Sequence, residues 1–109
     1  MLAEKLGIPE EKTVNCFQSR LGKDPWVKPY TDEVITELSA QGVKKVLAFS
    51  PAFVADCLET TVEVAGEYRD KFLEGGGEEW DLVPSLNSED TWVECVKEMV
   101  LEHSGAAVL

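Results

Sequence analysis

The chain has 109 residues, of which 44% are hydrophobic and 28% are charged, and its 10 basic and 21 acidic residues give a net charge of −11 at pH 7. This length fits one globular domain with a core of its own, so we expect a single domain over residues 1–109. The negative charge argues against nucleic acid and anionic membrane surfaces as partners, and it favours divalent cations.

Signals for export or membrane insertion are not apparent in the sequence. The longest weakly polar stretch, residues 46–58, is interrupted by a serine, a proline and an aspartate, whereas a membrane-spanning helix needs about 20 apolar residues. The first residues lack the basic and then apolar order of a signal peptide. The cysteines, Cys16, Cys57 and Cys95, are odd in number and show no paired spacing, which is typical of a reducing compartment. We therefore expect a cytoplasmic protein without a transmembrane segment.

The first half of the chain alternates between helix and strand signals. Residues 3–7 have the character of a helix end that stops at a glycine, and residues 13–19 (TVNCFQS) are rich in β-formers and predict a strand. A loop with one glycine and two prolines follows. We then expect a helix over 31–41, which has acidic residues in its first turn and ends at Gly42, and a buried strand over 43–50.

The second half continues the alternation. The longest helical pattern covers residues 53–75 and stops at three successive glycines, and a third strand over 80–84 and a closing helix over 91–103 follow. This order favours an α/β fold with a parallel sheet, although three strands make only half of a usual doubly wound sheet. The side chains expected to face the core are Val54, Leu58, Thr61, Val62, Ala65, Tyr68 and Phe72 on the long helix, and Trp92, Val96, Met99 and Val100 on the closing helix.

Candidate binding residues follow the predicted strands, because ligands bind open parallel sheets at the carboxyl ends of the strands. Gln18, Ser19, Arg20 and then Trp26 come after the first strand, and Phe53 comes after the second. An aromatic ring in a loop packs against the protein more often than it contacts a ligand. Both roles stay open for Trp26 and Phe53.

Six acidic residues share one face of the long predicted helix, opposite the apolar stripe. Glu59, Glu63 and Glu67 stack at intervals of four residues, where each like-charge pair destabilises a helix by about 0.2–0.5 kcal/mol. Bound cations would offset this repulsion, because clustered carboxylates form oxygen-ligand sites. The pattern alone fits either a solvated acidic face or a path for metal ions. The six residues are Asp56, Glu59, Glu63, Glu67, Asp70 and Glu74.

Three stretches resemble the ferrochelatases, which insert ferrous iron into a porphyrin during haem synthesis. They are FQSRLGKDPWVKPYTDE (17–33), SPAFVADCLETTVEVAGEY (50–68) and VPSLN (83–87), and their order and spacing agree with the C-terminal half of that family. The resemblance implies a three-layer, flavodoxin-like (chelatase-like) fold with a parallel sheet flanked by helices. It also implies that residues 1–109 are equivalent to the C-terminal lobe of a two-lobe enzyme.

The resemblance assigns roles to particular side chains. Glu59 is similar to the family's active-site glutamate, and Glu63 and Glu67 are similar to its acidic row. We group Asp56, on the same face, with these three as candidate metal ligands. Trp26 and Phe53 resemble porphyrin-facing aromatics, and Gln18, Ser19 and Arg20 resemble residues at the lip of the cleft. Arg20 also suits a porphyrin propionate, because its planar fork fits a carboxylate.

The activity implied by the resemblance is that of a lyase in the full-length protein. The family's essential histidine lies upstream of this sequence and His103 cannot replace it, so we expect the isolated chain to be inactive. Cys57 stands where relatives often have histidine. We interpret it in the first place as a packing residue and in the second place as a soft metal contact. We expect ferrous iron as a substrate, no tightly bound cofactor and no iron–sulfur cluster.

Expected partners are the porphyrin, the metal and the N-terminal lobe, with self-association through the surface that this lobe would cover. The alternatives are a non-catalytic module that carries metal or porphyrin and, less favoured, a chelatase for another metal and tetrapyrrole.

Overall fold

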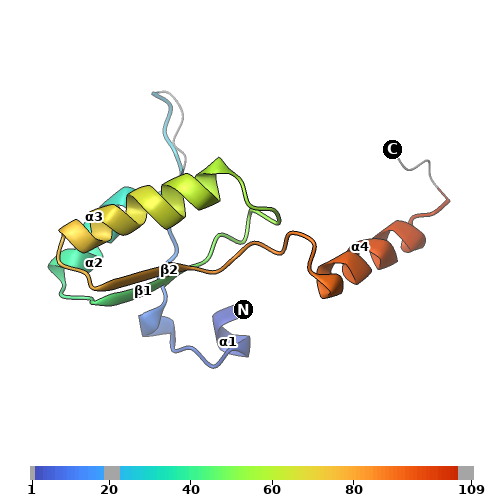
Figure 1. Ribbon diagram of the computed structural model, residues 1–109, viewed down its shortest axis with the longest axis horizontal. Coiled ribbons are helices and arrows are strands. Elements are labelled where there is room, and N and C mark those ends of the chain that lie inside the picture. Colours follow the sequence, from blue (N-terminus) through green and yellow to red (C-terminus); the bar gives the residue numbers. More distant parts are fainter. Residues whose placement is uncertain (1, 19–22, 106–109) are drawn as a thin grey trace.

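The computed structural model describes residues 2–18 and 23–105. Two short parallel strands form its sheet, and a long helical segment connects them (Figure 1). In chain order the elements are α1 (Leu2–Lys5), the 3-10 turn η1 (Glu10–Lys12), α2 (Thr31–Ala40), β1 (Lys45–Ala48), the π-helix η2 (Glu59–Tyr68), α3 (Arg69–Glu74), β2 (Glu79–Leu82) and α4 (Asp90–Glu102).

The sheet has the parallel arrangement that the alternating pattern predicts. β1 and β2 pair in register from Lys45 opposite Glu79 to Ala48 opposite Leu82. η2 and α3 pack on the face of the sheet that carries Val46 and Trp80, and α2 packs beside α3. The α/β class with a parallel sheet is therefore confirmed.

The strand expected over 13–19 is not formed by the described part of that segment, residues 13–18. Its only strand-like contact is one parallel bridge, in which the Phe17 N–H donates to the Pro29 carbonyl at 2.9 Å and the Thr31 N–H donates to the Phe17 carbonyl at 3.0 Å. The ladder cannot extend along the partner segment, because Pro29 has no N–H and α2 begins at Thr31. This single bridge nevertheless fixes the backbone next to Gln18.

The helix expected from residue 53 begins instead at Glu59. The preceding segment is held in a turn by the loop after β2, because the Asn87 N–H donates to the Val54 carbonyl and the Asp56 N–H donates to the Asn87 side-chain oxygen, both at 2.8 Å. These backbone groups are therefore unavailable for helical hydrogen bonds. The helix starts where that tether ends.

One cluster of four side chains, Ile35, Val64, Phe72 and Trp80, forms the core. Phe72 is fully buried, and its ring centroid lies 5.6 Å from that of Trp80. Thr60 is also buried, so the inward positions of η2 and α3 recur about every four residues, at 60, 64, 68 and 72, with Tyr68 half-buried.

The predicted core face of this helix is therefore wrong in its first half. Leu58 and Val62 are 74% and 50% exposed, and Val54 and Thr61 are exposed as well. The prediction assumed an α-helix of 3.6 residues per turn, whereas the i→i+5 hydrogen bonding of η2 widens each turn and rotates the inward face.

α4 matches the predicted closing helix to within one residue, but it has no buried residue. Figure 1 shows it extending away from the sheet and the other helices. Trp92 is half-buried, and Val96, Met99 and Val100 are exposed, so the prediction that these side chains face inward is wrong. An apolar stripe is buried only where another element covers it, and the loop after β2 carries α4 beyond the helices that cover the sheet.

The other face of the sheet also carries exposed apolar side chains. Leu47, which points away from the core residues Val46 and Ala48, is 68% exposed, and Phe49 is 49% exposed. Over the described ranges, no helix of the chain is long and apolar enough to cross a bilayer.

Candidate functional site

A shallow depression of about 370 Å³ lies between the bridge at Phe17, the start of α2 and the side of η2. We call it the Glu63 pocket. Among the described residues that line it, carboxylates predominate over cations, since Asp32, Glu63 and Glu67 stand beside Lys71. Gln18, Glu63 and Glu67, three of the residues predicted from the sequence, are thus brought together here.

Glu63 is held in the pocket by two hydrogen bonds to the same carboxylate oxygen. The Gln18 amide donates to Glu63 Oε1 at 3.1 Å, and the Tyr68 hydroxyl donates to it at 3.0 Å. Burial, and then the neighbouring Glu63 carboxylate, raise the pKa of the Tyr68 phenol far above its ordinary value. Tyr68 therefore stays protonated and remains a donor.

The contact between Glu63 and Tyr68 contradicts the sequence prediction that placed them on opposite faces. In an α-helix, residues five apart are rotated by about 140° from one another. The i→i+5 hydrogen bonding of η2 turns the chain through a smaller angle per residue, so Tyr68 is rotated back toward Glu63 and its hydroxyl reaches the carboxylate. Tyr68 packs against the core, as periodicity predicted, and its hydroxyl also belongs to the site, which periodicity did not predict.

Glu59 lies one turn before Glu63 on an exposed part of η2. A hydrogen bond from the Cys57 side chain, and a second from its own backbone N–H, lower the pKa of the Glu59 carboxyl. Its backbone carbonyl accepts a bond from the Gln18 amide at 3.4 Å. Glu59 is therefore an ionised carboxylate beside the pocket. In the described residues, no three Asp, Glu, His or Cys side chains are grouped as a metal ion would require.

Asp56 lies apart from the Glu63 pocket. Its carboxylate accepts bonds from the Asn87 amide at 2.9 Å, the Thr60 hydroxyl at 3.1 Å and the Ser85 N–H at 3.4 Å. Asn87, with a positive φ of 50° that asparagine tolerates, contributes most to a lowered pKa of the Asp56 carboxyl. The side chain thus ties the start of η2 to the loop after β2.

This tether predicts a stability that depends on pH. Because the folded pKa of Asp56 lies below its usual value near 3.8, the carboxylate stabilises the fold above that value, and the stabilisation is lost as the pH falls through the folded pKa. We expect the urea midpoint to fall less steeply between pH 5 and about 2 in Asp56→Asn than in the parent. Asp81→Asn, which changes an exposed aspartate on β2, is the control. If the urea midpoint falls equally steeply with pH in the parent and in Asp56→Asn, the stabilising role assigned to the Asp56 carboxylate is wrong.

Comparison with known proteins decides the family. The family model described as "Ferrochelatase" matches residues 1–104. The chain belongs to the ferrochelatase family. It is 44% identical over 105 residues to a ferrochelatase of Dechloromonas aromatica, covering 96% of this chain and 29% of the relative. Ferrochelatases of Ectopseudomonas mendocina and Pseudomonas syringae pv. tomato are 48% and 51% identical, over 89% and 83% of this chain and 28% and 26% of those proteins. The chain therefore spans less than a third of each of these relatives.

The predicted porphyrin contacts of this family are only partly placed by the structure. Ser19 and Arg20 lie outside the described residues. Trp26 is 40% exposed in the segment after them, and Phe53 is half-buried in the turn before η2. Neither ring is among the residues that line the Glu63 pocket, so Gln18 is the one predicted porphyrin contact found there.

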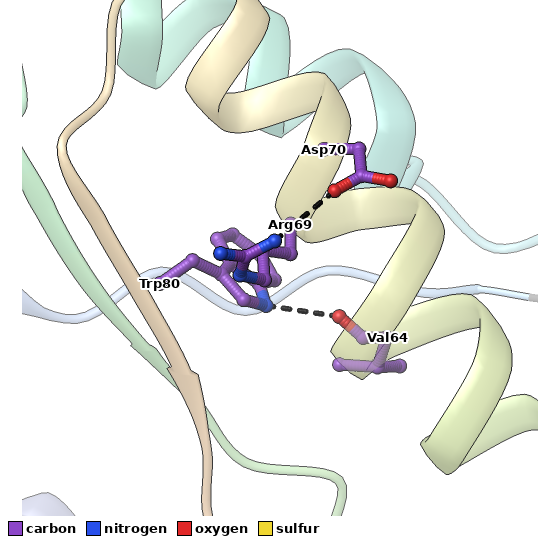
Figure 2. A network of polar contacts seen from close by, with 4 residues as sticks. All are labelled: Val64, Arg69, Asp70 and Trp80. Atoms are coloured by element: carbon purple, nitrogen blue, oxygen red, sulfur yellow. Dashed lines mark hydrogen bonds and ion pairs between the residues drawn. The ribbon is translucent and has the colours of Figure 1, made fainter.

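A buried hydrogen bond that the sequence did not predict holds η2 against the sheet. Figure 2 shows the Trp80 indole N–H reaching from β2 to the carbonyl of Val64, the residue after Glu63, at 2.9 Å. On the same helical segment Arg69 pairs with Asp70 at 3.2 Å. A buried tryptophan needs an acceptor for its N–H, and that requirement was the available signal. Trp80 thereby fixes the depth of the turn that carries Glu63.

Proposed function

We propose that this chain is the C-terminal lobe of a two-lobe ferrochelatase that inserts ferrous iron into a porphyrin. Membership of the family supports the activity, and the observation that carries the assignment of residues is the Gln18 amide, which joins Glu59 and Glu63 at the Glu63 pocket. Both carboxylates project from η2, directly after the turn that follows β1.

The chemistry of insertion requires two events at the same place. Two protons must leave the ring nitrogens, and a divalent cation must enter. A carboxylate performs either task, because it accepts a proton and also binds a hard or borderline cation. In this proposal the exposed Glu59 carboxylate, ionised because its pKa is lowered, accepts the two ring protons one after the other and releases each to solvent, and Glu63 and Glu67 conduct the cation toward it. Ferrous iron is thus a substrate, and we assign no iron–sulfur cluster and no other resident cofactor.

The porphyrin in this proposal lies against Trp26 and Phe53, with Arg20 beside a propionate. The N-terminal lobe is the proposed partner of the uncovered apolar surfaces, which are the sheet face with Leu47 and Phe49 and the stripe of α4. It would also supply the histidine opposite Glu59. His103, the single histidine of this chain, lies at the end of α4, where its ring contacts the Met99 carbonyl at 2.7 Å.

Mixing the 109-residue chain with a dicarboxylic porphyrin tests this assignment. We expect porphyrin fluorescence to be quenched on binding and the quenching to weaken in Trp26→Ala, while added Zn²⁺ produces no shift of the visible bands. Val93→Ala, which trims an exposed apolar residue of α4, is the control. Zn²⁺ insertion that disappears in Glu59→Gln would show that the chain needs no second lobe. Unchanged porphyrin fluorescence would contradict the proposed porphyrin site.

A further inference from the structure

The side-chain amide of Gln18 has no donor capacity left for a ligand. A primary amide nitrogen carries two hydrogens. One bonds to Glu63 Oε1 at 3.1 Å and the other to the Glu59 carbonyl at 3.4 Å. The backbone beside Gln18 is fixed by the bridge between Phe17 and Tyr30, so the amide is held where both acceptors are in reach.

Glu63 is held equally closely, but through only one of its oxygens. Oε1 accepts from Gln18 and from the Tyr68 hydroxyl, and these two donors come from different elements. Among residues 2–18 and 23–105, no hydrogen bond is made to Oε2. The carboxylate is thus oriented through one oxygen, and its side chain lines the Glu63 pocket.

From this geometry we infer that Gln18 and Tyr68 are positioning residues that hold Glu63 by Oε1 and present Oε2 as the single oxygen for an incoming divalent cation. This assignment rests on the proposed function and changes one part of it, since Gln18 then acts through Glu63 and not on the porphyrin. Hydrogen-bond donors behind a metal-binding carboxylate orient the ligand, and their removal typically costs 10–100-fold in metal affinity.

The test measures Mn²⁺ binding to the 109-residue chain by the loss of the free-ion electron paramagnetic resonance signal. Mn²⁺ is a suitable probe because it prefers oxygen ligands over the thiols of this chain. We expect Gln18→Met and Tyr68→Phe, which keep the size of each side chain and remove its donor, to weaken binding by about tenfold each. Gln41→Met, at the exposed end of α2, is the matched control and should bind as the parent does.

A further measurement separates positioning from a general structural effect. In a Glu63→Gln background, adding Gln18→Met should cause no further loss of Mn²⁺ affinity, since the group it acts through is gone. Circular dichroism confirms that each variant is folded.

The inference is overturned if Gln18→Met binds Mn²⁺ as tightly as Gln41→Met, if its effect persists without Glu63, or if the parent binds no Mn²⁺. It is also overturned if Gln18→Met abolishes porphyrin quenching and leaves Mn²⁺ binding unchanged. Failure of the proposed function has a different signature, namely a parent chain that binds Mn²⁺ but leaves porphyrin fluorescence unchanged.

Discussion

Phe72→Ala is expected to lower the free energy of unfolding by about 3–5 kcal/mol, the usual cost of removing a buried phenylalanine ring. Phe72 is the one fully buried aromatic side chain among the described residues, and it joins α3 to Trp80 of β2. A domain of this size has about 5–15 kcal/mol of stability in total, so the variant should be largely unfolded at low urea concentrations. Urea titration followed by far-ultraviolet circular dichroism measures the loss.

Gly77 provides an internal control for this prediction. A methyl group on Gly77 would overlap the Phe72 ring, so Gly77→Ala alone should cost about 1–3 kcal/mol through overpacking. Once Phe72 is alanine, the overlap is gone, and adding Gly77→Ala should cost little. If the two losses simply add, the assigned contact between these positions is wrong.

Under the proposed function, Glu59→Gln in the two-lobe enzyme is expected to reduce the turnover of metal insertion by about 10²–10⁴-fold, because glutamine neither accepts a proton nor carries charge. The Michaelis constant for porphyrin should change little, since the lost interaction belongs to the transition state. Steady-state insertion of Zn²⁺ or Fe²⁺, followed by the visible bands, measures both constants.

The matched control for Glu59→Gln is Glu74→Gln, the same substitution at the exposed end of α3 and outside the Glu63 pocket. It should leave turnover unchanged. A Glu59→Gln enzyme that retains more than a fifth of the parent turnover would remove Glu59 from the chemical step and point to Glu63 as the proton acceptor.

Local signals in the sequence were sufficient for most of the element order. α2 ends two residues before Gly42, the run at 43–50 contains β1 and the run at 80–84 overlaps β2, because glycine stops and apolar runs act over a few residues. The width of the helical turns after Glu59 was not readable in this way. Nor was the long-range bond from Trp80 to the Val64 carbonyl within those turns, since local patterns do not report contacts between distant residues.

The candidate site was likewise predictable only in part from the sequence. The rule that strand ends gather at one edge of a sheet predicted Gln18 as a site residue, although the strand before it is reduced to a single bridge, but its bond to Glu63 was not predicted. The part played by Tyr68 could not be anticipated, since it requires π-helical turns. α4 was recognised by its amphipathic pattern, but periodicity does not say which element covers an apolar stripe.

The bond between Gln18 and Glu63 joins residues 45 positions apart and so has a consequence for the order of folding. The core contacts of Ile35 with Trp80 span the same separation, so loop closure costs both about equally, but the core gains buried apolar area in return. Glu63 is held only by part-buried hydrogen bonds, so we expect its orientation to form after the core and to be lost before it under mild denaturation. Metal affinity would then decline before the core unfolds, and loss of the site would report local opening of the chain while its secondary structure persists.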